Sequence, residues 1–383
     1  MRILHTADWH LGRVLKGRER TEEVREALHR LLELVSSERV ELVLVAGDIF
    51  DRSVVSTEAE AAAFEFFVRL RELGVPALVI AGNHDNQERL EALAPLLALT
   101  GATARGRLRF AEEGGTVEVR GARVALLPFL SERRLVRVEH LRQGREVWKG
   151  AYGEGMRKII ANLTQGSGGG LFLLMAHLAV EGGRLGGGEF VFHTTNSYVL
   201  LPQHLPQHLT YVALGHLHQQ QQVCEAPVAW YPGSLIQLDF GEHEESPRGA
   251  LMVEVEAGKP PIVHPINERW GRPLKTFRFP LEELDRRWEE VRRFPGYSKV
   301  VIRGRGSPSL RERLFREQER LLEVEFELPE APSLPSQEPA PGLPDWTEIY
   351  AAYHQEQNGQ EAPPELLRAF REVLEESLQP SRI

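Results

Sequence analysis

The N-terminal part of the chain alternates between short, continuously apolar runs and longer segments in which apolar residues recur every three or four positions. The apolar runs lie at 3–6, 42–46 and 77–81, with later ones at 171–176 and 211–214. The periodic segments cover 21–36, 57–73 and 87–99. Apolar strands that alternate with amphipathic helices are typical of a parallel sheet buried on both faces. An α/β fold is therefore predicted.

From about residue 107 the pattern changes to short strands with glycines between them. Strands are expected at 108–111, 116–119 and 124–128, and the intervening glycines indicate antiparallel hairpins. Later strands at 228–231 and 250–255 complete a second sheet. We therefore expect residues 1–258 to form a two-sheet β-sandwich flanked by helices.

Three further segments follow this expected sandwich. Residues 259–330 alternate strand and helix patterns and predict a small α+β domain, and the proline-rich stretch 331–344 predicts an extended linker. Residues 345–383 carry two amphipathic patterns, which predict a helical hairpin too small to bury its own apolar stripe. This hairpin either packs against the rest of the chain or docks on a partner, and the long linker favours a partner.

Composition places few limits on function. The chain has 383 residues, and its net charge of −9 argues mildly against binding nucleic acid by bulk attraction, although metal ions and local arginines can bind phosphates. The single cysteine, Cys224, excludes an internal disulfide and fits a reducing cytoplasm. No run of about 18 apolar residues is present, and the N-terminus holds His5 and Asp8 where a signal peptide needs apolar residues. We therefore expect a cytoplasmic protein without a membrane span.

Residues able to bind a metal follow each of the five apolar runs. They are Asp8, His10, Asp48, Asn83, His177, His216 and His218. Because active sites of parallel sheets lie beyond the carboxyl ends of the strands, we expect these side chains to meet. A mixed nitrogen and oxygen set suits two divalent ions, and seven ligands give four to each ion if Asp48 is shared. His84 is placed to stabilise the transition state or to protonate a leaving oxygen, and Asp85 to orient His84.

The sequence around these residues resembles the five motifs of the calcineurin-like metallophosphoesterases. They read Asp8-x-His10, Gly47-Asp48, Gly82-Asn83-His84-Asp85, His177 and Gly215-His216-x-His218. The longer stretches 5–12, 46–51, 211–218 and 231–234 resemble the SbcD family of bacterial nuclease subunits. These motifs cover the first 250 residues or so, and the C-terminal part is only weakly similar.

The resemblance implies a metallophosphoesterase fold with two divalent ions, Mn²⁺ before Mg²⁺. It implies that the first ion is held by Asp8, His10, Asp48 and His218, and the second by Asp48, Asn83, His177 and His216. His84 corresponds to the catalytic histidine of the family. Asp51 stands where archaeal and eukaryotic relatives carry a second histidine.

The same resemblance implies a DNA nuclease of repair and recombination. It would be a 3′–5′ exonuclease on double-stranded ends and an endonuclease on single strands and hairpins. The family's partner is an SMC-like ATPase of the SbcC type, bound through the C-terminal helices, and 259–330 corresponds to a capping domain. Helices 57–73 and 87–99 carry apolar surface that serves either the core or a homodimer face.

Basic residues after the first two motifs are the expected DNA contacts. They are Arg13, Lys16, Arg18, Arg20 and Arg52, although a solvated charged loop explains them equally well. Two rival functions stay open at this point. One is a phosphodiesterase or phosphatase for small molecules on the same scaffold, and the other is a protein that mainly tethers DNA ends.

Overall fold

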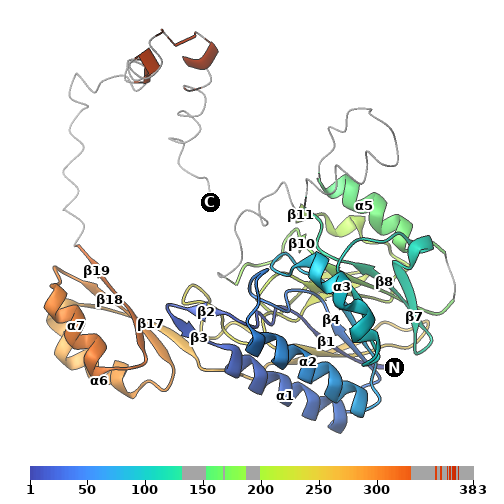
Figure 1. Ribbon diagram of the computed structural model, residues 1–383, viewed down its shortest axis with the longest axis horizontal. Coiled ribbons are helices and arrows are strands. Elements are labelled where there is room, and N and C mark those ends of the chain that lie inside the picture. The colour runs from blue at the N-terminus through green and yellow to red at the C-terminus, as the bar shows by residue number, and fades with distance from the viewer. Residues whose placement is uncertain are drawn as a thin grey trace. The chain divides into compact units, whose positions relative to one another are not determined.

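The computed structural model describes residues 1–131, 152–166, 169–186 and 199–328, together with stretches of one to three residues from 350 to 370 (Figure 1). The chain divides into two compact units, Met1–Glu327 and Leu328–Ile383. The first unit contains two six-stranded sheets and a separate three-stranded sheet. No helix among the described residues is long and apolar enough to cross a membrane.

The first sheet carries the strand–helix alternation of the N-terminal part. Its order is β16 (Ile262–Ile266), β15 (Ala250–Glu254), β1 (Arg2–Thr6), β4 (Leu42–Val45), β5 (Ala77–Ile80) and β6 (Ala102–Arg105). The strands from β1 to β6 are parallel, while β15 and β16 are antiparallel to their neighbours. Its outer face packs against α1 (Thr21–Ser37), α2 (Thr57–Glu72) and α3 (Gln87–Ala98) (Figure 1).

The second sheet packs against the inner face of the first. Its order is β13 (Gln221–Glu225), β14 (Val228–Tyr231), β12 (Tyr211–Gly215), β9 (Leu171–His177), β8 (Ala122–Leu127) and β7 (Thr116–Val119). Side chains alternate along the strands, so Ile3, Leu44 and Ile80 meet Leu173 and Tyr211 between the sheets. The outer face is covered by α5 (Tyr152–Leu163). The predicted helix-flanked sandwich is therefore confirmed.

The three-stranded sheet is parallel, and two helices cover it. It consists of β17 (Leu274–Pro280), β18 (Tyr297–Arg303) and β19 (Leu321–Glu327), with α6 (Leu284–Arg293) and α7 (Pro308–Glu317). Small elements complete the description: β2 (Val14–Leu15), β3 (Arg18–Glu19), β10 (Ala179–Val180), β11 (Val199–Leu200), and the 3₁₀ turns η1 (Ala111–Glu113), η4 (Pro202–His204) and η5 (Leu281–Glu283). This sheet has its own buried core, built around Phe279, Val291 and Ile302.

Several boundaries differ from the sequence prediction. No strand forms at 108–111, which leads into η1, and β6 forms earlier at Ala102–Arg105. The neighbours β8 and β9 are parallel, so only β7–β8 is the expected hairpin. Strand β16 pairs with β15 and so extends the first sheet beyond residue 258. The linker 331–344 and most of the predicted hairpin 345–383 lie outside the described residues.

Helix ends follow local capping chemistry. Ser56 and Asn86 cap α2 and α3, because their side chains accept hydrogen bonds from Ala59 N and Arg89 N at 3.3 and 3.0 Å. Thr21, the expected cap of α1, is instead its first helical residue. Its hydroxyl is already used, because it accepts from Gly12 N at 3.1 Å and donates to a glutamate.

Candidate metal centre

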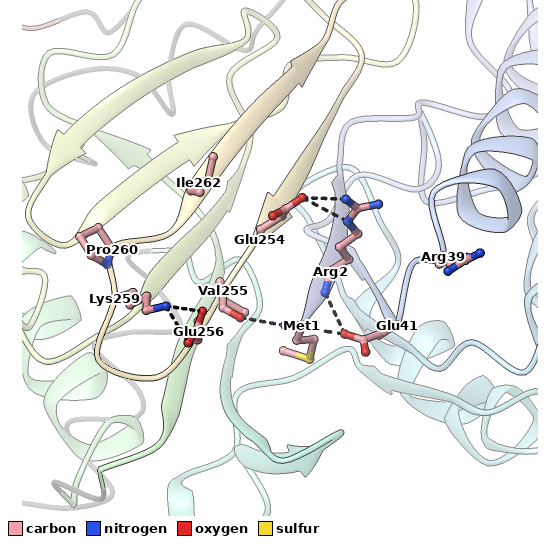
Figure 2. A pocket seen from close by; sticks show the side chains of 10 residues that line it. All are labelled: Met1, Arg2, Arg39, Glu41, Glu254, Val255, Glu256, Lys259, Pro260 and Ile262. Atoms are coloured by element: carbon pink, nitrogen blue, oxygen red, sulfur yellow. Dashed lines mark hydrogen bonds and ion pairs between the residues drawn. The ribbon is translucent and has the colours of Figure 1, made fainter.

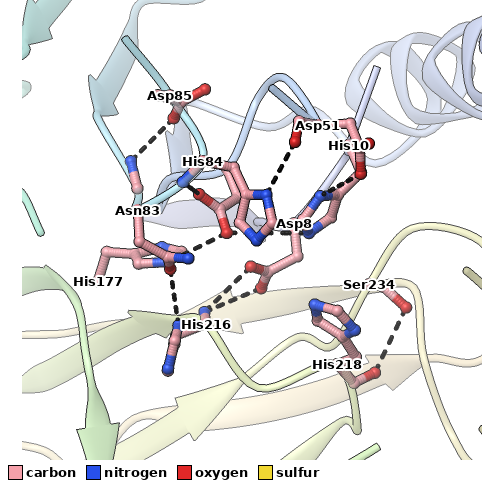
Figure 3. Close-up of polar contacts among 12 residues, drawn as sticks. Asp8, His10, Asp51, Asn83, His84, Asp85, His177, His216, His218 and Ser234 are labelled. Carbon is pink, nitrogen blue, oxygen red and sulfur yellow. Dashed lines mark hydrogen bonds and ion pairs between the residues drawn. The ribbon is translucent and has the colours of Figure 1, made fainter. Parts of the chain in front are cut away.

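Polar residues at or just after the carboxyl ends of β1, β4, β5, β9 and β12 converge on one another (Figure 3). Backbone hydrogen bonds join the first two loops: Asp8 N donates to Gly47 O at 3.0 Å, and His10 N donates to Asp48 O at 3.1 Å. Asp8, His10 and Asp48 have φ values of 52°, 48° and 50°. A left-handed backbone at such residues costs roughly 1–3 kcal/mol and is concentrated at functional sites. Local strain is thus stored where these side chains meet.

Two glycines allow the loops to approach one another this closely. A Cβ atom at Gly82 would overlap the carboxylate of Asp48, and one at Gly47 would overlap the ring of His177. Gly47 also has a φ of 94°, which favours glycine. The Gly-Asp and Gly-Asn motifs therefore have a steric basis in the packing of the site.

All seven predicted ligands lie in one cluster. Three overlapping groups have ligand atoms within 4.8 Å of one another: Asp8–His10–His218, His10–Asp48–His84 and Asp8–Asp48–His177. Asn83 joins them, because its Oδ1 lies 3.0 Å from His177 Nε2 and 2.9 Å from His216 Nδ1. The backbone N–H of His216 also donates to both carboxylate oxygens of Asp8 (Figure 3).

The surroundings of His10 show that a cation fits this cluster. The side chain is 1% exposed, and neither ring nitrogen has a well-formed hydrogen bond to a described residue. Its Nε2 lies 3.8 Å from Asp48 Oδ2, and the same oxygen lies 3.4 Å from His177 Nε2. Asp48 Oδ2 is thus buried between two imidazole nitrogens, and one of them is too far away for a hydrogen bond. Cations bound between the oxygen and the nitrogens would satisfy all three atoms.

The electrostatics of the cluster also favour a cation. Burial raises the pKa of Asp8 to about 7, because the charged carboxylate is removed from water. Burial acts in the same direction on Asp48, but the charge and hydrogen bond of His177, together with the charges of His84 and His10, outweigh burial and hold the pKa of Asp48 well below its usual range. Burial lowers the pKa of His177, yet the attraction of Asp48 raises it overall to about 9. These buried carboxylates therefore draw positive charge to the position where the imidazoles converge.

Two of the imidazoles are oriented from behind. His177 Nδ1 lies 2.8 Å from Ala46 O, and His218 Nδ1 lies 3.1 Å from Glu242 Oε1. With Nδ1 protonated, each ring would offer Nε2 to a bound cation, which displaces any proton held there. Ser234 supports the same loop, because its backbone N–H donates to His218 O at 3.0 Å. The sequence pattern gives no indication of the contribution of Glu242.

His84 stands beside the cluster, as predicted, but Asp51 rather than Asp85 orients it. Its backbone N–H donates to Asp48 Oδ1 at 2.9 Å, and its Nδ1 lies 2.8 Å from the carbonyl oxygen of Asp51. Its ring centroid is 4.8 Å from that of His10. The Asp51 carboxylate lies 3.3 Å from His10 Nδ1, so Asp51 is adjacent to both rings.

The prediction that Asp85 orients His84 is wrong. The carboxylate of Asp85 instead accepts hydrogen bonds from three backbone N–H groups, those of Ile49, Phe50 and Gly82. Burial raises the pKa of Asp85 to about 6, with a further contribution from the charge of Asp48. Asp85 therefore ties the loop after β4 to the loop after β5 and shapes the site through the backbone.

The five basic residues expected to contact DNA differ in their ion pairs and in their exposure. Arg13 Nη1 lies 3.1 Å from Asp51 Oδ1, Lys16 Nζ lies 2.7 Å from Glu323, and Arg18 Nη2 lies 3.7 Å from Glu319. The side chain of Arg52 is 71% exposed beside the cluster.

Arg20 is placed differently, because it is fully buried. Its guanidinium pairs with Glu23 at 2.7 Å and donates to the carbonyl oxygens of Gln237 and Arg272. The expectation that Arg20 contacts DNA is therefore not supported.

Two cavities bear on where a substrate enters. A cavity of about 350 Å³ opens beside Asn83 and is lined also by Ser53, Asn86 and Phe129. A second, of about 590 Å³, lies at the opposite end of β1 (Figure 2). Arg2 pairs with Glu254 at 3.0 Å and Lys259 with Glu256 at 2.9 Å in this cavity, and its lining includes no metal-binding group of the cluster. The first cavity is the one that adjoins the candidate chemistry.

Comparison with known proteins identifies the family. Residues 1–220 match the calcineurin-like phosphoesterase family. The SbcD subunit of the Bacillus subtilis nuclease SbcCD is 32% identical over 285 residues, which cover 73% of this chain and 72% of that protein. The SbcD proteins of Staphylococcus epidermidis and Rhodobacter capsulatus are 28% and 33% identical over 294 and 303 residues; the matches cover 76% and 74% of this chain, and 74% and 72% of those proteins. The chain therefore belongs to the calcineurin-like phosphoesterases and, within them, to the SbcD family of SbcCD nuclease subunits.

Proposed function

We propose that this chain is a metal-dependent DNA nuclease whose phosphodiester cleavage takes place at the buried cluster around Asp48. The observation that carries the proposal is the position of Asp48 Oδ2 between the imidazoles of His10 and His177. A bridging carboxylate with a set of ligands on either side is the arrangement that a two-metal phosphoesterase needs. The similar SbcD proteins are named as nucleases, which supports DNA as the substrate.

The ligands divide into two sets that share Asp48. Asp8, His10, Asp48 and His218 would hold one ion, and Asp48, Asn83, His177 and His216 the other. The histidine-rich sets disfavour Mg²⁺, which prefers oxygen ligands, and the family resemblance favours Mn²⁺. When bound, such a pair of ions acidifies a water molecule and neutralises charge on the phosphate.

The residues of the chain itself supply positioning and proton transfer. His84 is held at Nδ1 by the carbonyl of Asp51, which turns Nε2 away from that contact. A protonated ring in this position can donate from Nε2 to the leaving oxygen, and a neutral ring can accept a proton there. Asp85 keeps the loops in register through its backbone hydrogen bonds.

The finer parts of the proposal follow the family. We infer a 3′–5′ exonuclease on double-stranded ends and an endonuclease on single strands and hairpins. Its partner would be an SMC-like ATPase of the SbcC type, bound by residues 345–383, with residues 259–330 acting as a capping domain. Exposed leucines and valines on and next to α2 and α3 support a homodimer face: Val68, Leu73, Leu96 and Leu99 are 43–66% exposed.

The test is a cleavage assay on double-stranded, hairpin and single-stranded DNA with Mn²⁺, Mg²⁺ or a chelator. We expect cleavage with Mn²⁺ and none with the chelator. His84→Ala should lower the rate by about 100-fold or more, the typical contribution of a positioned acid or base. His264→Ala is the matched control, because His264 is exposed on β16 far along the chain from the motifs.

The rival functions predict different results. A small-molecule phosphodiesterase would hydrolyse a phosphodiester such as bis-p-nitrophenyl phosphate in a His84-dependent way and leave all three DNA substrates intact. A tethering protein would lose cleavage in the His84→Ala variant but retain full biological activity there. DNA hydrolysis missing in the wild type, or full biological activity without cleavage, would contradict the proposed nuclease.

A further inference from the structure

A further carboxylate, that of Glu242, lies behind the cluster and is almost fully buried. Its Oε1 lies 3.1 Å from His218 Nδ1, and its Oε2 accepts a hydrogen bond from Leu238 N at 3.1 Å. Among the residues that the structure describes, no lysine or arginine lies within ion-pair distance of this carboxylate. A buried carboxylate is costly unless its oxygens are satisfied, so both are committed to fixed positions.

Gln237 connects this carboxylate residue to the three-stranded sheet. Its Oε1 accepts from Leu274 N at 2.8 Å, and its Nε2 donates to Leu274 O at 3.2 Å and to Glu242 O at 3.0 Å. The amide is 3% exposed and pairs with Leu274, the first residue of β17, much as a neighbouring strand would. Movement of the start of β17 must therefore break these bonds or displace Glu242.

Arg20 holds the same junction from the other side. Its guanidinium donates to Gln237 O and, at 3.1 Å, to Arg272 O. Glu23, its partner in the ion pair, also accepts from Arg272 N at 2.6 Å. These hydrogen bonds thereby join the start of α1, the loop that carries Gln237 and the approach to β17 in one network.

We propose that Glu242 is a positioning residue that fixes the tautomer and orientation of His218, and that Gln237 couples this contact to the three-stranded sheet. The contact holds the imidazole proton on Nδ1 and leaves the Nε2 lone pair for a cation. The position of β17 would then influence metal affinity through Leu274, Gln237 and Glu242. This inference rests on the proposed metal-binding function of His218.

Glu242→Gln tests the first step, because it keeps the size of the side chain and removes its charge. An amide can donate to Nδ1, so we expect His218 in the metal-free protein to shift toward the Nε2–H tautomer, observed by long-range ¹⁵N–¹H NMR of labelled histidines. Mn²⁺ affinity, measured by titration calorimetry, should fall by about 10- to 100-fold. Glu242→Asp, which keeps the charge, should retain more affinity than Glu242→Gln.

Gln237→Ala tests the coupling without touching the carboxylate. We expect a smaller loss of Mn²⁺ affinity in the same direction, together with a partial shift of the His218 tautomer. Gln318→Ala is the matched control: Gln318 is a half-buried amide that donates to Val291 O and Arg292 O within the three-stranded sheet unit, away from the network. It should lower stability and leave Mn²⁺ affinity unchanged.

The outcomes separate the inference from the function on which it rests. If the wild-type chain binds no Mn²⁺, the proposed function fails. If the wild type binds and cleaves, but Glu242→Gln leaves both the tautomer and the affinity unchanged, only the positioning role is overturned. If Gln237→Ala changes neither the His218 tautomer nor the Mn²⁺ affinity, the coupling to β17 is overturned.

Discussion

His5 lies in β1 between the two sheets and should make the fold sensitive to acid. It is fully buried; its Nδ1 lies 2.9 Å from the hydroxyl of Tyr211, and its Nε2 lies 3.1 Å from Leu214 O. A carbonyl can only accept, so Nε2 carries the proton of the neutral ring and Nδ1 accepts from the tyrosine. Burial raises the pKa of Tyr211 far above its usual value, which keeps the phenol as a neutral donor.

The size of the effect follows from the shifted pKa. Burial lowers the pKa of His5 to about 3 from 6.5, and the hydrogen bond to Leu214 offsets only part of the shift. Between these two values the unfolded chain binds the proton and the folded chain does not, so folding stability falls as the pH falls. Above pH 6.5 His5 does not change the free energy of unfolding with pH. Below pH 6.5 it lowers the free energy of unfolding by about 1.4 kcal/mol per pH unit, which amounts to about 2 kcal/mol lost at pH 5.

The assay is the free energy of unfolding in urea, measured at several pH values between 7 and 5 in the presence of a chelator. His5→Asn keeps an acceptor for Tyr211 but cannot be protonated, so its loss of stability toward pH 5 should be smaller than that of the wild type by about 2 kcal/mol. His264→Asn, at an exposed site, should retain the wild-type slope. Equal slopes for His5→Asn and the wild type would refute the reasoning.

Two further predictions concern stability and assembly. Arg20→Met leaves Glu23 without its buried partner and should lower the free energy of unfolding in urea by about 3–5 kcal/mol. Arg52→Met, at an exposed position, should change it by less than about 0.5 kcal/mol, and similar losses for the two variants would contradict the buried ion pair. Leu96→Glu with Leu99→Glu should convert the proposed homodimer to a 43.3 kDa monomer in light scattering, whereas Ile262→Glu, at an equally exposed residue of β16, should not.

The sandwich could be predicted because its central strands are buried on both faces. Strands such as Leu42–Val45 and Ala77–Ile80 are apolar at every position, so they stand out from the helices between them. Strand β6, Ala102–Arg105, lies at the edge of the first sheet, and its burial alternates. Such a short, half-polar segment gives no clear periodic signal, which explains why the sequence pattern does not reveal it.

The convergence of the candidate metal ligands was predictable for a topological reason. Parallel strands place their carboxyl ends at the same edge of a sheet. Packing of the two sheets therefore brings together the polar residues at the ends of β1, β4, β5 and β9. The orienting contacts follow no such rule. Glu242 reaches His218 through the fold of a loop, and Asp85 bonds to backbone rather than to its neighbour His84. These contacts depend on loop conformation, which residue spacing does not encode.

The basic residues after the first motif differ in exposure, which residue spacing does not reveal either. Lys16 and Arg18 form exposed pairs with Glu323 and Glu319, and such pairs are worth at most about 1 kcal/mol, so a DNA phosphate can replace the glutamate. Arg20 cannot be released without breaking its buried network. In anisotropy titrations of the His84→Ala background against salt, Lys16→Ala should therefore reduce the slope of log affinity by about 0.9. Arg20→Met, measured at a temperature where the variant stays folded, should leave this slope unchanged. A larger change of slope for Arg20→Met than for Lys16→Ala would show that the buried arginine contacts DNA.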